Sequence, residues 1–490
     1  MYWLGIDIGT GGSRALLVDA QGCIRHAVTV AHEEMRMEHP LWAEQRPENW
    51  WDASRAAVAA VLKESGVSGA EVKGIGLSGQ MHGLTLLDAS DRIVRPALIW
   101  CDQRSQSQVD WVNATAGAPF VLEQTANPML TGFTLPKLLW VRDNELAAFA
   151  RIRKVMLPKD WIRFQLTGEY ASDVSDASGT GLFDVVNRRW ALPLVAKLGL
   201  DASLLPTVVE SSAISGRVSA KAAAETGLAE GTPVVGGAGD QAASAAGNGI
   251  VETGIVSCTI GTSGVVFAHL DQPAYDAAGR VHTFCHSVAD AWHVMGVTQG
   301  AGLSLQWFRN QLAPGVSYDQ LTAEAAQAPA GSQGLYWLPY LMGERTPHLD
   351  ATARGGWIGM TAKHTRADLI RALIEGVSYS QVDCLQIIEQ MGVAVKSVRV
   401  SGGGAKSPFW RQLLADVFGK PVVTLETQEG SAHGAALLAM VGTGEFATLA
   451  ECCKAVIREV DVCEPAKDRK VYVDGHQAYQ ALYPALKGLV

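Results

Sequence analysis

Two aspartates stand where a carboxylate could take part in a reaction. Asp7 lies in the apolar segment 3–8, directly before a glycine-rich turn. An ionised side chain is costly there unless a cation or hydrogen-bond donors compensate its charge. A Mg²⁺ ion bridging phosphates would compensate it, usually through water, and the alternative is that Asp7 hydrogen-bonds its own turn.

Asp240 precedes a run of small residues, 242–247, that predicts a tightly packed helix. The simplest role for an aspartate at this position is that of a helix N-cap. Small neighbours also leave room for a ligand, and a carboxylate there could accept a proton from an attacking hydroxyl. From this segment alone, both roles stay open.

Three glycine-rich turns follow strand-like segments. Residues 9–13 join predicted strands at 3–8 and 14–18, and residues 261–264 join strands at 255–260 and 265–268. The third turn, 402–404, separates a strand at 397–400 from a helix that begins near Pro408. Glycine lets backbone N–H groups converge on a phosphate oxygen, although the third turn could equally serve close strand–helix packing.

This arrangement differs from the two common nucleotide-binding motifs. The chain has no G-x-x-x-x-G-K-[ST] loop, and its first glycines lead into a strand rather than a helix. Phosphoryl transfer mainly needs positioning, charge neutralisation and one group that orients or deprotonates the nucleophile. Asp7 with a metal, Asp240 as base, and backbone donors in the first two turns would meet those needs.

The elements that must position these groups follow an α/β pattern. Strand-like runs at 74–78 and 232–236 alternate with helical stretches such as 48–63, and the two hairpins suggest a duplicated architecture. The glycine- and alanine-rich stretch 236–254 predicts a hinge, so we expect domains at 1–248 and 249–490. Trp50 and Trp51 are expected to fill the core, and 473–490 is expected to form a closing helix.

The composition narrows the class of protein. The chain has 490 residues, 48% hydrophobic, and a net charge of -9, which disfavours nucleic-acid binding. No apolar stretch is long enough to span a bilayer and no signal peptide is recognised, so we expect a cytoplasmic protein. Its eight cysteines include no Cys-x-x-Cys pair, which argues against a zinc site or a disulfide framework.

Four motifs, in this order along nearly the whole chain, carry a family resemblance. They are GIDIGT at 5–10, GAGDQA at 237–242, IGTSG at 260–264 and GGGA at 402–405. Together they resemble the FGGY carbohydrate kinases. The resemblance implies an actin-like, ribonuclease-H-like ATPase fold in both domains, with a catalytic cleft that closes around ATP and sugar.

A further segment, SGQMHG at 78–83, resembles the sugar-binding loop of the xylulokinase members of that family. The resemblance implies transfer of the γ-phosphate of ATP to the 5-hydroxyl of D-xylulose, with ATP and Mg²⁺ required. It also implies that Asp240 is the catalytic base and that Asp7 supports the metal. The sequence allows a homodimer.

The same resemblance assigns the binding residues. For the sugar it implies contacts from Gln80, Met81, His82, Trp100, Asp240 and Gln241. For ATP it implies contacts from Thr10, Gly11, Gly12, Thr262, Gly302, Gln306, Gly403 and Gly404. By its chemistry, His82 could donate to a sugar hydroxyl or bond its own turn, and Trp100 could face the sugar or belong to the core.

Two alternative functions remain open at this point. The chain could phosphorylate another pentulose or a polyol, or it could be a non-catalytic actin-like ATP switch. Asp240 and the polar loop at 78–83 have no evident role in such a switch.

Overall fold

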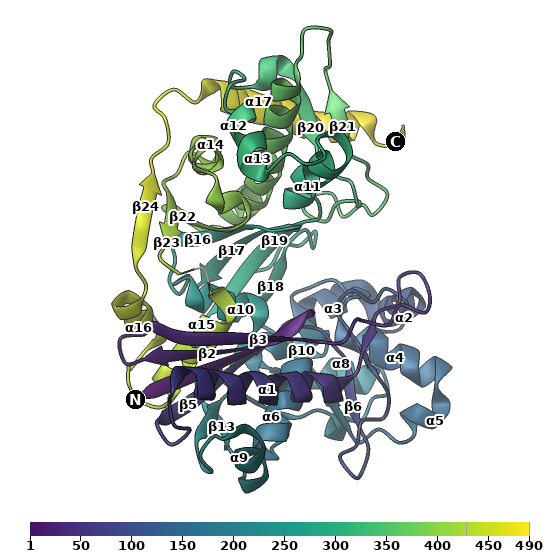
Figure 1. Cartoon of the computed structure of the whole chain (residues 1–490). Coiled ribbons are helices and arrows are strands. Elements are labelled where there is room, and N and C mark those ends of the chain that lie inside the picture. Colours follow the sequence, from purple (N-terminus) through teal and green to yellow (C-terminus); the bar gives the residue numbers. More distant parts are fainter. Residues whose placement is uncertain (428, 490) are drawn as a thin grey trace.

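The computed structural model describes residues 1–427 and 429–489 and shows two α/β lobes stacked on one another (Figure 1). Each lobe contains a seven-stranded mixed sheet. The first has the order β13-β14-β5-β1-β2-β3, with β15 pairing on β5, and the second has the order β18-β19-β17-β16-β22-β23-β24.

The strands of the first sheet are β1 (Tyr2–Ile8), β2 (Gly12–Asp19), β3 (Ile24–Ala31), β5 (Val72–Gly79), β13 (Ile214–Arg217), β14 (Pro233–Val235) and β15 (Ala238–Gly239). Those of the second are β16 (Ile255–Ile260), β17 (Gly264–Leu270), β18 (His282–Cys285), β19 (Trp292–Thr298), β22 (Ser397–Gly402), β23 (Val422–Leu425) and β24 (Glu459–Cys463).

The centres of the two sheets share one arrangement. In the first, β1 pairs with β2 as an antiparallel hairpin and with β5 in parallel. In the second, β16 pairs with β17 in the same antiparallel way and with β22 in parallel. Alternating apolar residues of β1, such as Leu4, Ile6 and Ile8, are fully or nearly fully buried, as a sheet covered by helices requires. The repeat read from the sequence is thus visible in the fold.

The expected helices form close to their expected positions. They are α1 (Pro47–Ser65), α10 (Asp240–Gly247), α14 (Pro408–Phe418) and α17 (Lys470–Leu486). Trp50 and Trp51 are buried on α1, in the core of the first lobe. The C-terminal helix begins before residue 473 and ends at Leu486, and Val490 lies outside the described residues.

The C-terminal part of the chain also contributes to the first lobe. Helix α15 (Gly430–Gly442) packs against β1, β5 and α10 (Figure 1). Its backbone approaches so closely that a Cβ atom on Gly76 would lie 1.8 Å from the Ala435 oxygen. After α16 (Leu449–Val456) the chain returns to the second sheet as β24. The predicted division at 248/249 therefore assigns α15 to the second domain, although this helix packs against the first lobe.

Within the described residues, no helix is long and apolar enough to cross a membrane.

Candidate active site

The register of three parallel strands brings Asp7 and Asp240 together. Asp7 on β1 is paired with Ser78 on β5, and Ser78 is paired with Ala238 on β15. Since parallel strands end at the same edge of a sheet, Asp240, which follows β15, lies at the edge where β1 ends. Gly239 is the N-cap of α10 and Asp240 is its first helical residue, so the N-cap role considered for Asp240 is wrong.

The two carboxylates influence each other electrostatically. Burial, and then the charge of Asp7, raise the pKa of Asp240 to about 7, while polar groups of Gln241 lower it in part. Burial also raises the pKa of Asp7, against the lowering effect of the Ser78 hydroxyl and the Arg14 guanidinium. A carboxylate whose pKa lies near neutral pH is suited to accept a proton and to release it again.

Asp7 has an oxygen that fits a cation. Its Oδ1 is buried and has no hydrogen-bond partner among the described residues. Leaving a buried acceptor unsatisfied typically costs about 1–3 kcal/mol. No cluster of three or more His, Cys, Asp or Glu side chains suited to a metal occurs in the described parts of the chain. A metal at Asp7 would therefore take most of its ligands from phosphates and water, as Mg²⁺ commonly does.

Thr10 is the centre of the first glycine turn. Its hydroxyl donates to Oε1 of Gln80 at 3.3 Å and accepts from the Trp100 indole N–H at 2.9 Å. Gly11 has open space where a side chain would be, whereas a Cβ on Gly12 would lie 2.7 Å from the Val30 oxygen. Trp100 is 43% exposed, so it is not a core residue.

Gln80 stabilises this turn through hydrogen bonds. Its amide is 2% exposed and donates to Gln45 Oε1 at 3.0 Å, and Gln45 in turn donates to the Thr10 carbonyl at 2.7 Å. The indole N–H of Trp50 donates to the same Gln45 oxygen at 3.0 Å. Gln80 and Trp100 therefore both converge on Thr10, and their sugar contacts stay predictions.

His82 is held in a defined tautomer. Its Nδ1 lies 2.7 Å from the Gly179 carbonyl oxygen, and a carbonyl can only accept, so Nδ1 carries the proton. Burial, with smaller effects from nearby cations, lowers the pKa of His82 to about 3, so the ring is neutral. Nε2 is left as an acceptor. Because Nδ1 donates to Gly179, His82 does not bond its own turn, and its contact with a sugar stays a prediction.

The loop that carries His82 reaches the base. Met81 is 4% exposed, and a Cβ on Gly239 would lie 2.8 Å from the Met81 side chain. The absence of a side chain on Gly239 therefore lets the loop at 78–83 lie directly against the residue that precedes Asp240.

Aromatic residues that the sequence did not indicate surround His82. The ring of Phe133 lies 5.1 Å from the His82 ring, between centroids, and that of Phe284 lies 6.0 Å away. Phe284 belongs to β18 and stacks on His282 at 5.6 Å. The sugar loop thus contacts the second sheet as well as the first. Nothing in the local sequence distinguishes these aromatic residues from core residues.

The predicted nucleotide residues gather at one edge of the second sheet. Ile260, at the end of β16, is paired with Gly402 at the end of β22. Helix α11 (Ala301–Leu312) begins beside the hairpin turn, because the Gly302 N–H donates to the Gly261 carbonyl at 2.8 Å and the Leu303 N–H donates to that of Thr262 at 3.1 Å.

Two glycines in this group lie where a side chain would collide with a neighbouring residue. A Cβ on Gly302 would lie 2.4 Å from the Gly261 oxygen, and one on Gly404 would lie 2.8 Å from the Ile260 side chain. Gly403 is exposed, as are the side chains of Thr262 and Gln306. The two turns and the start of α11 are therefore assembled as expected, and their contacts with ATP stay predictions.

Comparison with known proteins agrees with this geometry. Residues 2–247 match the N-terminal domain of the FGGY family of carbohydrate kinases, and residues 256–443 match its C-terminal domain. The chain belongs to the FGGY family of carbohydrate kinases. It therefore has the two-domain FGGY kinase fold with a cleft between the domains, as expected from the sequence.

Individual FGGY kinases resemble the whole chain. The xylulose kinase of Bacillus subtilis (strain 168) is 38% identical over 489 residues, which cover 100% of this chain and 98% of the relative. That of Escherichia coli (strain K12) is also 38% identical and covers 100% of both chains. The crystal structure of a xyloylose kinase from Brucella ovis superposes with a TM-score of 0.95 at 38% identity, over 100% of both chains.

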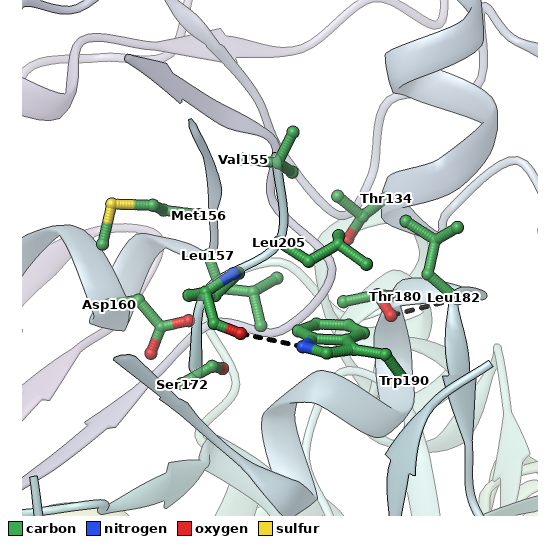
Figure 2. A pocket seen from close by; sticks show the side chains of 11 residues that line it. Thr134, Val155, Met156, Leu157, Asp160, Ser172, Thr180, Leu182, Trp190 and Leu205 are labelled. Atoms are coloured by element: carbon green, nitrogen blue, oxygen red, sulfur yellow. Dashed lines mark hydrogen bonds between the residues drawn. The ribbon is translucent and has the colours of Figure 1, made fainter. Parts of the chain in front are cut away.

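One small cavity of this FGGY kinase is lined by none of the predicted site residues. It has a volume of about 10 Å³, and Figure 2 shows Asp160 and Ser172 on one side of it and Trp190 on the other. This volume suffices for about one water molecule. The cavity is therefore too small for a sugar or a nucleotide.

Proposed function

We propose that this FGGY kinase transfers the γ-phosphate of ATP to the 5-hydroxyl of D-xylulose, with Asp240 as the general base. The main support is the position of Asp240, whose pKa is raised to about 7 next to Asp7 and to the Met81–His82 loop. The names of the similar proteins described above support xylulose as the sugar.

In this mechanism Asp240 takes the proton of the 5-hydroxyl as its oxygen attacks the γ-phosphorus. A new bond forms between O5 and phosphorus, the bond between phosphorus and the β–γ bridging oxygen breaks, and ADP leaves. His82 Nε2 accepts a hydrogen bond from another sugar hydroxyl, while the aromatic rings of Phe133 and Phe284 exclude water beside it.

Backbone N–H groups of the glycine turns stabilise the charge on the phosphate oxygens. We further propose Mg²⁺ as the cation beside Asp7, because the buried Oδ1 of Asp7 has no other partner among the described residues. When bound, Mg²⁺ would neutralise part of the triphosphate charge. Asp7 would hold it directly or through water.

The substrate assignment is tested by measuring ADP release with D-xylulose, L-xylulose, D-ribulose, L-ribulose and glycerol. We expect the highest kcat/KM with D-xylulose. A preference for another sugar would replace D-xylulose by that sugar and leave the kinase chemistry in place. ATP hydrolysis that is indifferent to every sugar would instead indicate the ATP switch.

A further inference from the structure

A cluster of ionisable side chains is buried behind Asp240. Lys159 and Arg163 on α6 (Pro158–Thr167), with Asp160, Asp173 and Asp176, are all 0% exposed. Lys159 Nζ lies 2.7 Å from Asp160 Oδ1, 3.0 Å from Asp173 Oδ1 and 3.5 Å from Asp176 Oδ2. Arg163 lies 3.6 Å from Asp160. We call these five residues the Lys159 cluster.

The Lys159 cluster places two basic side chains among three carboxyl groups. Burial raises the pKa of Asp176 well above its ordinary value. The ammonium group of Lys159 opposes this shift, whereas the neighbouring carboxylates, Asp240 among them, add to it. Burying paired charges of this kind stabilises a fold little compared with apolar packing, because each charge loses its hydration. A role in positioning would account for such a costly arrangement.

The cavity beside the Lys159 cluster is too small for a sugar or a nucleotide. This cavity has a volume of about 10 Å³, and Asp160 and Ser172 line one side of it (Figure 2). That space holds about one water molecule, and apolar side chains form most of the remaining wall.

A chain of hydrogen bonds connects the Lys159 cluster to the residue before Asp240. Asp173 Oδ2 accepts from the Ser175 hydroxyl at 2.6 Å, from the Ser175 N–H at 2.9 Å and from the Ser211 hydroxyl at 3.0 Å. The Ser175 oxygen in turn accepts from the Gly239 N–H at 3.1 Å. A serine hydroxyl has one proton, and Ser175 donates it in the hydrogen bond to Asp173. Towards Gly239 the Ser175 oxygen can therefore only accept.

We propose that Ser175 is a positioning residue for Asp240. Lys159 fixes Asp173, Asp173 fixes the hydroxyl of Ser175, and that oxygen fixes the peptide group between Ala238 and Gly239. Met81 packs against Gly239 from the sugar loop, so this peptide is held by Ser175 and packed by Met81. Asp240 is the next residue and starts α10, so its carboxylate depends on this support. The inference rests on the proposed role of Asp240 as base.

The test compares Ser175→Ala with Ser211→Ala. Both serines are buried and both donate to the same oxygen of Asp173, but only Ser175 contacts Gly239. For Ser175→Ala we expect kcat to fall about 10- to 100-fold, the scale of small misplacements of a catalytic group. The KM values for sugar and ATP should change less than about threefold, since binding groups stay in place. Ser211→Ala should lose about as much thermal stability as Ser175→Ala. Its kcat should nevertheless stay within about twofold of the wild-type value.

Two results would overturn the positioning role. One is a folded Ser175→Ala variant with wild-type kcat, and the other is an equal loss of kcat in both variants, which would assign the effect to Asp173 alone. If Ser175→Ala does not fold, Ser175→Cys decides. Its thiol is a weak acceptor of nearly the same shape, so kcat should still fall, and unchanged kcat would contradict the proposal.

The kinetics are measured with whichever sugar the wild type phosphorylates fastest. A wild type that prefers another sugar therefore contradicts the proposed substrate, whereas an unaffected Ser175→Ala variant contradicts only the positioning role.

Discussion

The pKa of Asp240 is the residue-scale property with the most direct kinetic consequence. Burial and the charge of Asp7 raise it to about 7. Only the ionised carboxylate can accept the hydroxyl proton, so activity is present above this pKa and is lost as the pH falls through it. We expect kcat/KM to decrease about tenfold for each pH unit below about 7. Initial rates measured from pH 5 to 9, at saturating ATP, would show this limb.

Asp240→Asn keeps the shape of the side chain and removes its basicity. We expect kcat to fall about 10²- to 10⁴-fold, the usual contribution of a general base, and the remaining activity to lose its dependence on pH near 7. Calorimetric titration should show that sugar and ATP still bind. A folded Asp240→Asn enzyme with normal turnover would remove Asp240 from the mechanism.

Asp7→Asn separates the two effects of the Asp7 carboxylate. Removing its negative charge should lower the pKa of Asp240, so the acid limb of the pH profile moves to lower pH. The amide also binds Mg²⁺ less well than a carboxylate, so the Mg²⁺ concentration for half-maximal rate should increase. Both are measured in one matrix of pH and Mg²⁺ concentration. An unchanged Mg²⁺ requirement would show that the metal does not depend on Asp7.

At the scale of elements, the backbones of α15 and the first sheet pack so closely that one added methyl group should lower the stability of the fold. A Cβ on Gly76 would lie 1.8 Å from the Ala435 oxygen, so Gly76→Ala forces the helix and sheet apart. We expect a loss of about 3 kcal/mol in the free energy of unfolding, at the upper end for overpacking. Urea denaturation measures it.

Gly356→Ala is the matched control for this substitution. Gly356 lies in β21 (Gly356–Ile358), and a Cβ there would meet no atom within 4 Å. Its free energy of unfolding should change by less than about 1 kcal/mol. Equal effects of the two substitutions would mean that the loss of glycine itself, rather than contact with α15, determines stability.

The sequence predicts elements whose signals are local, and misses those that depend on distant partners. The hairpins, α1 and the small-residue helix α10 all have nearby signals: glycine turns, a proline at the helix start, and a run of alanines. The segment that forms α15 is apolar on nearly all sides, which predicts burial but does not indicate which sheet covers it. Likewise, Ser175 and Gly239 are 64 residues apart, and nothing in either segment predicts their hydrogen bond.

At the scale of the whole molecule, the two lobes are connected by a segment of the C-terminal half that packs in the first lobe. Helices α15 and α16 belong to the first lobe, but in sequence they lie between β23 and β24, which pair as neighbouring strands of the second sheet. Detachment of α15 from the first lobe would therefore displace the chain on both sides of it, where β23 and β24 begin or end. The loop with His82 adds a further contact, because its ring lies against Phe284 of β18.

These connections predict that both lobes unfold in one transition, although proteins with two domains often unfold in steps. Urea denaturation followed by tryptophan fluorescence and by circular dichroism should give coincident curves, with an m-value that corresponds to exposure of the whole chain. An ATP analogue should shift both curves to the same extent, because ligand binding stabilises everything that unfolds together. Two separated transitions, of which the analogue shifts only one, would show that α15 leaves the first lobe independently of the second sheet.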